Sequence, residues 1–246
     1  MFYMYEKRES SGLSQISGDD GIATITCTLI AIASATKSIT VLNNCGAVIT
    51  VGVLTNGAGG GSPEMSFDLT TGASNSFSKP DSWGGRVWGR YLCSGSAGSD
   101  SQRCGVPGAT NPASLAEFFF HGVGGKDFYD ISLVDGYNIP MSIAPGGGTP
   151  PSGYSCGSPK CHIASCPPEF AVKDSTGNVI SCQSDCSKTG SPEHCCSGEY
   201  NSPDVCKASE NSAAIKEVCP DAYSFAYDDQ DSTYECAAES FTVNFC

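Results

Sequence analysis

The sequence has few basic residues and few histidines, and both shortages narrow the functions open to it. Only 13 lysines and arginines stand against 26 aspartates and glutamates, a formal net charge of −13. Nucleic acid and anionic membranes repel such a chain, so neither is an expected partner. The three histidines, His121, His162 and His194, form no array of metal ligands. We therefore expect no metal and no other cofactor.

Several familiar catalytic motifs are also missing. The sequence contains no G-x-S-x-G elbow, no P-loop and no H-E-x-x-H pair. The acidic run at 228–231 lacks the spaced oxygens of an EF-hand loop and is interpreted as a solvated turn. Any catalytic chemistry must therefore come from other residues.

Cysteine, in contrast, is abundant. Fourteen of the 15 cysteines lie between Cys45 and Cys246. The C-x₂-C pairs of a zinc ribbon are missing, so disulfides explain the set better than zinc does. Disulfides indicate an oxidising compartment, and we expect a secreted protein of the extracellular space or cell wall.

Residues 1–35 are predicted to be a signal or leader segment. The apolar run 21–35 ends in Ala33-Ser34-Ala35, a small-x-small cleavage pattern, and is too short to span a bilayer comfortably. Removing it takes away Cys27 and leaves fourteen cysteines and a net charge of −11. The polar residues before the run are unusual for a signal peptide, and a buried first strand is the alternative. We expect no stable membrane insertion.

Most of the remaining chain has the pattern of short strands. β-branched runs bounded by turn residues predict strands at 38–42, 48–53, 67–69, 76–78, 86–92, 117–121 and 128–133. Such a series is typical of a sandwich or flattened barrel. After Met141 the composition changes to a linker-like stretch at 146–151 and nine cysteines within 156–219. One helix is predicted at 210–218, stopped by Pro220, and strand composition returns at 223–227 and 240–245.

Several segments together resemble the thaumatin-like, or osmotin-like and pathogenesis-related, family. They are Asn43-Asn44-Cys45, 85–90 (GRVWGR), 115–118 (LAEF), 127–141 (DFYDISLVDGYNIPM), Cys195-Cys196, 219–224 (CPDAYS) and Phe245-Cys246. The resemblance implies a mainly β fold, with a flattened sandwich or barrel core and a disulfide-rich subdomain of loops and a helix. The core would comprise 36–162 and 220–246, and the subdomain 163–219. Residues 91–115 would form a shortened cystine loop, because the family's further small loop after Cys104 is absent.

The resemblance also implies a complete set of disulfides for the fourteen cysteines. The implied pairs are Cys45–Cys246, Cys93–Cys104, Cys156–Cys236, Cys161–Cys219, Cys166–Cys182, Cys186–Cys195 and Cys196–Cys206. Adjacent Cys195 and Cys196 would then bond to different partners.

In the family, an acidic groove between core and subdomain is lined by one arginine, one glutamate and three aspartates. Matched motif by motif, these fall on Arg86, Glu117, Asp130, Asp135 and Asp221. Arg90 is an alternative to Arg86, since strand alternation puts both on one face. Glycoside hydrolysis needs one protonated and one ionised carboxyl. Glu117 would be the general acid and Asp135 the base or nucleophile, while Arg86, Asp130 and Asp221 would bind substrate.

Each of these residues also has a structural interpretation. The carboxylates could form an ion-pair network with Arg86, Asp221 could cap the turn after the helix, and Asp130 could be a solvated strand residue. Asp135-Gly136 could be a turn pair. The aromatic residues near these positions, Phe118, Phe119, Phe120, Phe128, Tyr129, Tyr137, Tyr223 and Tyr227, suit sugar stacking, but alternation sends about half of them into the core.

The expected function is therefore binding of β-1,3-glucan in the acidic groove, with weak endo-β-1,3-glucanase activity as a further expectation, by a monomeric protein. The alternative is a non-enzymatic defence or antimicrobial protein that acts through a surface receptor or perturbs membranes. A third class, an inhibitor or a sweet-taste-type ligand, generally needs exposed basic residues, which are scarce here.

Overall fold

The computed structural model describes residues 35–57, 62–91, 93, 104–108, 111–163 and 165–246. They belong to one compact unit, Ala35–Cys246. The predicted leader, with Cys27 and nearly all of its apolar run, lies outside the described residues, as does most of the loop at 94–103.

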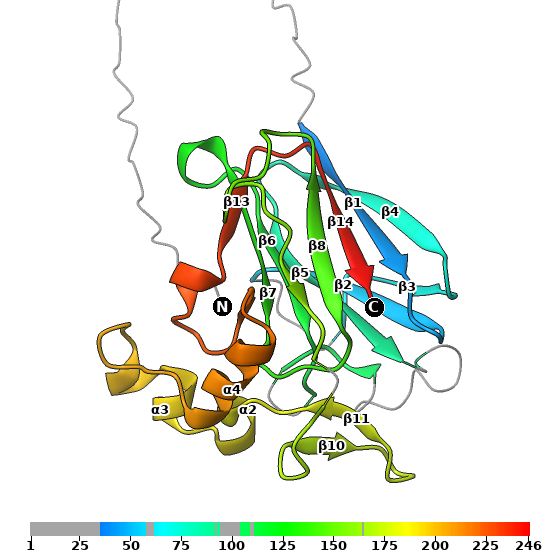
Figure 1. Cartoon of the computed structure of the whole chain (residues 1–246). Coiled ribbons are helices and arrows are strands. Elements are labelled where there is room, and N and C mark those ends of the chain that lie inside the picture. The colour runs from blue at the N-terminus through cyan, green and yellow to red at the C-terminus, as the bar shows by residue number, and fades with distance from the viewer. Residues whose placement is uncertain (1–34, 58–61, 92, 94–103, 109–110, 164) are drawn as a thin grey trace, which may run out of the picture. The chain divides into compact units, whose positions relative to one another are not determined.

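Two β-sheets form the main part of this unit (Figure 1). Sheet A has the strand order β4-β1-β14-β8-β9, and sheet B the order β12-β7-β6-β5-β2-β3, with β13 also paired to β7. Sheet A consists of β1 (Thr36–Asn43), β4 (Ser74–Pro80), β8 (Met141–Gly146), β9 (Lys160–Cys161) and β14 (Ser240–Phe245). Sheet B consists of β2 (Ile49–Thr55), β3 (Met65–Leu69), β5 (Gly84–Tyr91), β6 (Leu115–Phe119), β7 (Asp127–Ser132), β12 (Ala222–Tyr223) and β13 (Tyr234–Cys236).

The remaining elements lie mostly in the cysteine-rich part of the chain. They are the hairpin β10 (Ala171–Lys173) and β11 (Val179–Cys182), the helices α2 (Asp185–Thr189), α3 (Pro192–Cys195) and α4 (Glu210–Val218), and the 3-10 turns η2 (Val123–Gly125), η3 (Gly198–Tyr200) and η4 (Asp229–Asp231). No helix among the described residues is long and apolar enough to cross a membrane.

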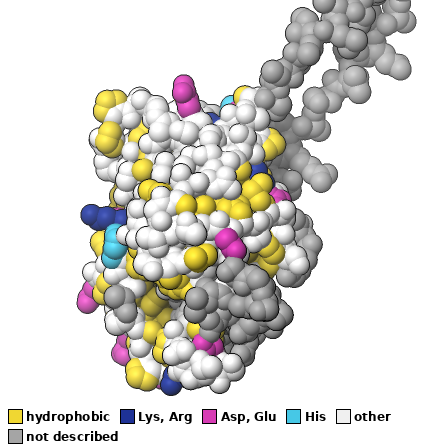
Figure 2. Space-filling model, turned by 90° about the vertical axis from the view of Figure 1, so that its right-hand side faces the viewer, with side chains coloured by type: hydrophobic (Ala, Val, Ile, Leu, Met, Phe, Trp, Pro, Cys, Tyr) yellow, Lys and Arg dark blue, Asp and Glu magenta, His cyan; other side chains and the backbone are white. Residues whose placement is uncertain are grey.

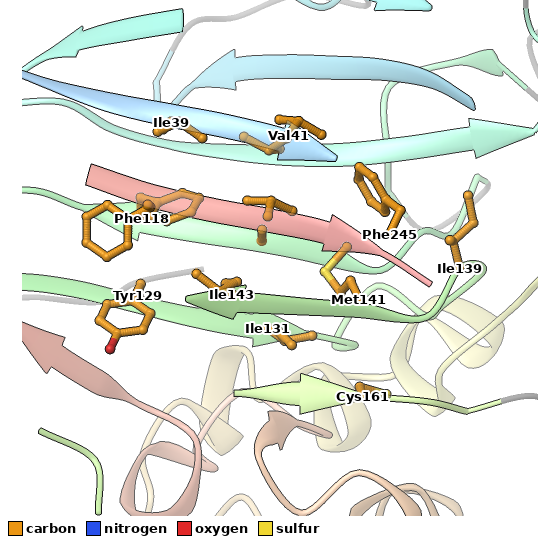
Figure 3. Packing of buried hydrophobic residues seen from close by; sticks show 14 of the residues in the cluster. Ile39, Val41, Phe118, Tyr129, Ile131, Ile139, Met141, Ile143, Cys161 and Phe245 are labelled. Carbon is orange, nitrogen blue, oxygen red and sulfur yellow. The ribbon is translucent and has the colours of Figure 1, made fainter. Parts of the chain in front are cut away.

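The core lies between the two sheets, because alternate residues of each strand point inward. Ile39 and Val41 of β1 and Phe245 of β14 belong to one hydrophobic cluster with Phe118 and Tyr129 of sheet B, and each of these five is fully buried. Figure 3 shows the labelled side chains of both sheets in the layer between them. On the face drawn in Figure 2, hydrophobic side chains form a band with isolated charged side chains around it.

A second, smaller apolar cluster covers part of the outer face of sheet B. It contains Leu54, Trp88, Ala113 and Leu115. Gly52 of β2 is needed here, since a Cβ at this position would lie 2.3 Å from the Trp88 ring. The segment around Ala113 thus packs on one part of the outer face.

Seven disulfides staple the unit, and their pairs are the seven that the family resemblance implies. Cys195 bonds Cys186, whereas the adjacent Cys196 bonds Cys206. The β1 strand runs parallel to β14, and Cys45–Cys246 joins the segments that follow them. The division into a core and a subdomain at 163–219 stays a prediction.

The mainly β fold and the helix are confirmed, and one predicted strand is wrong. The helix α4 spans 210–218 as predicted, with the Ser209 hydroxyl accepting from the Ser212 N–H at its start. The strand predicted at 223–227 ends at Tyr223, because the N–H and hydroxyl of Ser224 both donate to the Asp228 carboxylate and turn the chain. The β8 strand, inside the stretch whose composition changes, was not predicted.

Candidate functional site

Three of the predicted site residues lie side by side on the outer face of sheet B. Arg86 of β5 is the register partner of Glu117 of β6, and Glu117 is the partner of Asp130 of β7. Directly paired residues on neighbouring strands point to the same face of a sheet. Their chain neighbours Val87, Phe118 and Tyr129 all point into the core, so the three paired residues point away from it. We call Arg86, Glu117 and Asp130 the acidic row.

Burial increases along the acidic row. Arg86 is half-buried, Glu117 is 7% exposed and Asp130 is 1% exposed, so the interpretation of Asp130 as a solvated strand residue is wrong. Neither carboxyl oxygen of Asp130 has a hydrogen-bond partner among the described residues. Burial, and next the negative charge of Glu117, raise the pKa of Asp130 well above its ordinary value. The geometry therefore favours a neutral Asp130 beside Glu117.

A tyrosine and an aspartate extend this environment. Tyr223 of β12 is the register partner of Ser132, two residues beyond Asp130 on β7, and its hydroxyl donates to Asp229 Oδ1 at 2.7 Å. Burial is the main cause that raises the pKa of Tyr223, and the nearby Asp130 carboxyl adds to it when it is ionised. Asp229 had been placed in a solvated turn from the sequence, and it is indeed exposed. The hydrogen bond between Tyr223 and Asp229 forms only because residues 224–233 fold back, so no local sequence pattern predicts it.

Two phenylalanines form the next cross-strand row on the same face. Phe119 and Phe128 are register partners, each is two residues from a carboxyl of the acidic row, and each is half-buried. In contrast, Phe118, Phe120, Tyr129 and Tyr137 are core residues. The expectation that about half of the eight aromatic residues pack in the core is thereby confirmed.

Asp135 lies apart from the acidic row along the chain. It occupies the turn after β7, in which the Gly136 N–H donates to the Leu133 carbonyl at 2.9 Å and Gly136 has a φ of 109°. The neighbouring Val134 carbonyl accepts from the Ser184 hydroxyl at the start of α2. Asp135-Gly136 is thus a turn pair, and the half-buried Asp135 lies where the core meets the cysteine-rich segment.

Asp221 immediately precedes β12, and its contacts lead away from the acidic row. Its Oδ2 accepts from the Lys160 N–H at 3.3 Å. Burial, and next the charge of Asp221, raise the pKa of Tyr234. Asp221 is half-buried and lies next to β9 and β13.

Arg90 has a different role from Arg86, although both lie on the outer face. Arg90 is 4% exposed, and its guanidinium donates to the carbonyl oxygens of Pro112 at 2.5 Å, Asn111 at 2.8 Å and Gly105 at 3.2 Å. Arg86, not Arg90, is therefore the arginine in register with Glu117.

The outer face thus combines a cation, two adjacent carboxyls and two accessible aromatic rings. Among the described residues, no cluster of histidine, cysteine, aspartate and glutamate is arranged to hold a metal ion. A buried carboxyl pair with an arginine and aromatic rings beside it suits a hydroxyl-rich neutral ligand. These features define a disulfide-stapled β-sandwich protein with a candidate carbohydrate site on sheet B.

Comparison with known proteins identifies the family. The model of the Thaumatin family matches residues 43–246. "Thaumatin-like protein 1" of Pyrus pyrifolia is 40% identical over 225 residues, which cover 84% of this chain and 89% of that protein. "Pathogenesis-related protein 5" of Arabidopsis thaliana is 38% identical over 227 residues, 87% of this chain and 92% of that protein. A protein of Prunus avium named "Glucan endo-1,3-beta-glucosidase" is 39% identical over 222 residues, 83% of this chain and 88% of that protein. The chain belongs to the thaumatin family.

Proposed function

We propose that this protein is secreted and binds β-1,3-glucan on the outer face of sheet B, as part of a defence against organisms with glucan walls. The observation that carries the proposal is the pair of adjacent rows, the acidic row and Phe119–Phe128. The names of two relatives, one a glucan endo-1,3-beta-glucosidase and one pathogenesis-related, support the substrate and the setting.

The two rows are well spaced for a sugar chain. They are two residues apart along β6 and β7, which is roughly 7 Å. A pyranose can lay its C–H face on the half-buried rings of Phe119 and Phe128 while Arg86 donates to its hydroxyls. Glu117 and Asp130 lie lower in the face, so only the exposed edge of the Glu117 carboxyl could reach the sugar, and the buried Asp130 would act on the sugar only through Glu117. The half-buried Asp135 and Asp221 remain candidates for direct contact with hydroxyls.

Binding can be tested by sedimentation with insoluble β-1,3-glucan, with chitin and cellulose as controls. Phe119→Ala and Arg86→Ala should each weaken glucan binding roughly tenfold, since each removes a central contact. Phe67→Ala is the matched control, because Phe67 is also half-buried but lies on β3 and packs against Phe77. Equal weakening by all three variants would indicate a general loss of folding and contradict the site.

Hydrolysis is a narrower proposal at the same place. Glu117 as general acid and Asp135 as base or nucleophile stay the predicted pair, and the buried Asp130 would act through Glu117 as a positioning residue. Glu117→Gln keeps the shape but removes the titrating proton, so reducing-end release from β-glucans should fall about a hundredfold or more. Full activity of this variant would refute the assignment of the acid.

The same assays distinguish the alternative. Wild-type protein that sediments with β-1,3-glucan but releases no reducing ends is a binder without turnover. Protein that neither binds nor cleaves any β-glucan would favour action through a surface receptor. We further propose that the protein is monomeric, which size-exclusion chromatography with light scattering can check.

A further inference from the structure

A cleft separate from the acidic row lies between the β10–β11 hairpin and the part of the core where β5 ends. Its volume is about 660 Å³, and it is lined by residues from five stretches of the chain, among them Ala47, Tyr91, Tyr137, Ile163 and Val179. This volume is within the range of pockets that bind small molecules. No residue of the acidic row lines it.

Much of the wall of the cleft is apolar. Ile163 and Tyr137 belong to the main core cluster, and the Cys166–Cys182 disulfide crosses the same wall. Val179 on β11 is 53% exposed, which makes it one of the few large hydrophobic side chains on the described surface. An apolar ligand in the cleft would remove this side chain from water, which is favourable.

Two buried polar groups in the lining have unused hydrogen-bonding capacity. Arg90 is 4% exposed, and its Nε–H has no acceptor among the described residues. Ser181 is also 4% exposed, and its hydroxyl has no partner among them. Buried polar groups are normally hydrogen-bonded, so each points to a missing partner.

The charge on Arg90 is also only partly compensated. The hydrogen bonds that its guanidinium makes to described residues all go to neutral carbonyl oxygens, and no described carboxylate forms an ion pair with it. Burial accordingly lowers the pKa of Arg90 to about 10. The other charged residue of the lining, Asp174, accepts hydrogen bonds from Thr176 and Asn178 in its own turn. An anionic head group would therefore bind near Arg90, and the negative charge of Asp174 would not exclude it from the rest of the cleft.

We propose that this cleft binds a small amphipathic carboxylic acid, with its apolar body against Ile163, Tyr137 and Val179 and its carboxylate toward Arg90. The class is that of medium-chain fatty acids, which combine a flexible apolar body with one acidic head. The site is independent of glucan binding on sheet B.

Titration calorimetry with decanoate and decanol at pH 7 tests the proposal on the disulfide-intact protein. Decanoate should bind, and decanol should bind at least about tenfold more weakly because it lacks the charge-assisted hydrogen bond. Amide NMR shifts should locate the bound decanoate at β11 and Tyr91. Equal affinities for the two probes, no binding of either, or shifts confined to other surfaces would each overturn the proposal.

The same substitution, valine to glutamate, made inside and outside the cleft gives a matched control. Val179→Glu places a carboxylate in the cleft and should weaken decanoate binding tenfold or more, whereas Val205→Glu should change it less than twofold. Val205 is similarly exposed, at 49%, but does not line the cleft. Arg90→Gln should remove the preference for decanoate over decanol. If that variant does not fold, the comparison of Val179→Glu with Val205→Glu still tests the proposed site. Unchanged binding by Val179→Glu, or equal losses in both glutamate variants, would contradict the site.

Discussion

Replacing Asp130 by asparagine should stabilise the protein progressively as the pH rises above about 4. In the folded state, burial and the charge of Glu117 raise the pKa of Asp130. In the unfolded state the same carboxyl titrates near its ordinary pKa of about 3.9. The folded state therefore holds a proton that the unfolded state has already released, and unfolding becomes easier as the pH increases.

The magnitude follows from this linkage. Between the unfolded and folded pKa values of Asp130, its contribution to the free energy of unfolding should fall by about 1.4 kcal/mol per pH unit. Below about pH 4, both states carry a neutral carboxyl, and asparagine is nearly isosteric with it. The difference in unfolding free energy, variant minus wild type, should thus be flat at low pH and then rise with that slope.

Urea unfolding at a series of pH values from 2 to 7, with the disulfides intact, measures this difference directly. Asp174→Asn is a control of opposite sign, since hydrogen bonds led by that from Thr176 lower the pKa of Asp174 to about 2. Its difference should therefore decrease as the pH rises from 2 to 4. A flat or falling difference for Asp130→Asn between pH 4 and 7 would refute the neutral, buried Asp130.

Three further predictions concern the processed chain and its packing. If the leader is removed, the intact mass of the secreted protein should correspond to a chain that begins near Thr36, and no cysteine should react with an alkylating agent. A mass that includes the leader, or one free thiol, would contradict this. Non-reducing peptide mapping should find Cys195 joined to Cys186, and a Cys195–Cys206 peptide would overturn the pairing. Gly52→Ala should destabilise the protein by about 1–3 kcal/mol in urea unfolding, since its methyl group overlaps a tryptophan ring 2.3 Å away. An unchanged midpoint would show that the sheet accommodates the methyl group.

The sequence predicted those parts of the fold in which local pattern and tertiary structure agree. The helix at 210–218 was predicted at its true bounds because Pro220 stops it and its apolar residues repeat at helical spacing. The β8 strand was not predicted because it ends in Pro145-Gly146, which is unusual for a strand. It is extended because it pairs with β14, beginning with Met141 opposite Phe245. Strand pairing of this kind joins segments far apart in the chain and has little local signal.

The candidate site shows the same division. Alternation placed Arg86 and Arg90 on one face, but only the register of β5 with β6 could assign Arg86 to Glu117. The burial of Asp130 was likewise invisible, because an aspartate at a polar position of a strand normally faces water. The part played by Asp229 required the turn of 224–228 that the strand pattern had missed.

The position of β14 has a consequence for how the chain is made. This strand lies in the middle of sheet A, between β1 and β8, yet it is translated after every other strand of that sheet. Until it emerges, β1 and β8 each present an unpaired edge, and Cys45 must wait for a partner 201 residues later. A stop codon anywhere before residue 240 would therefore leave sheet A without its central strand and Cys45 without its disulfide partner.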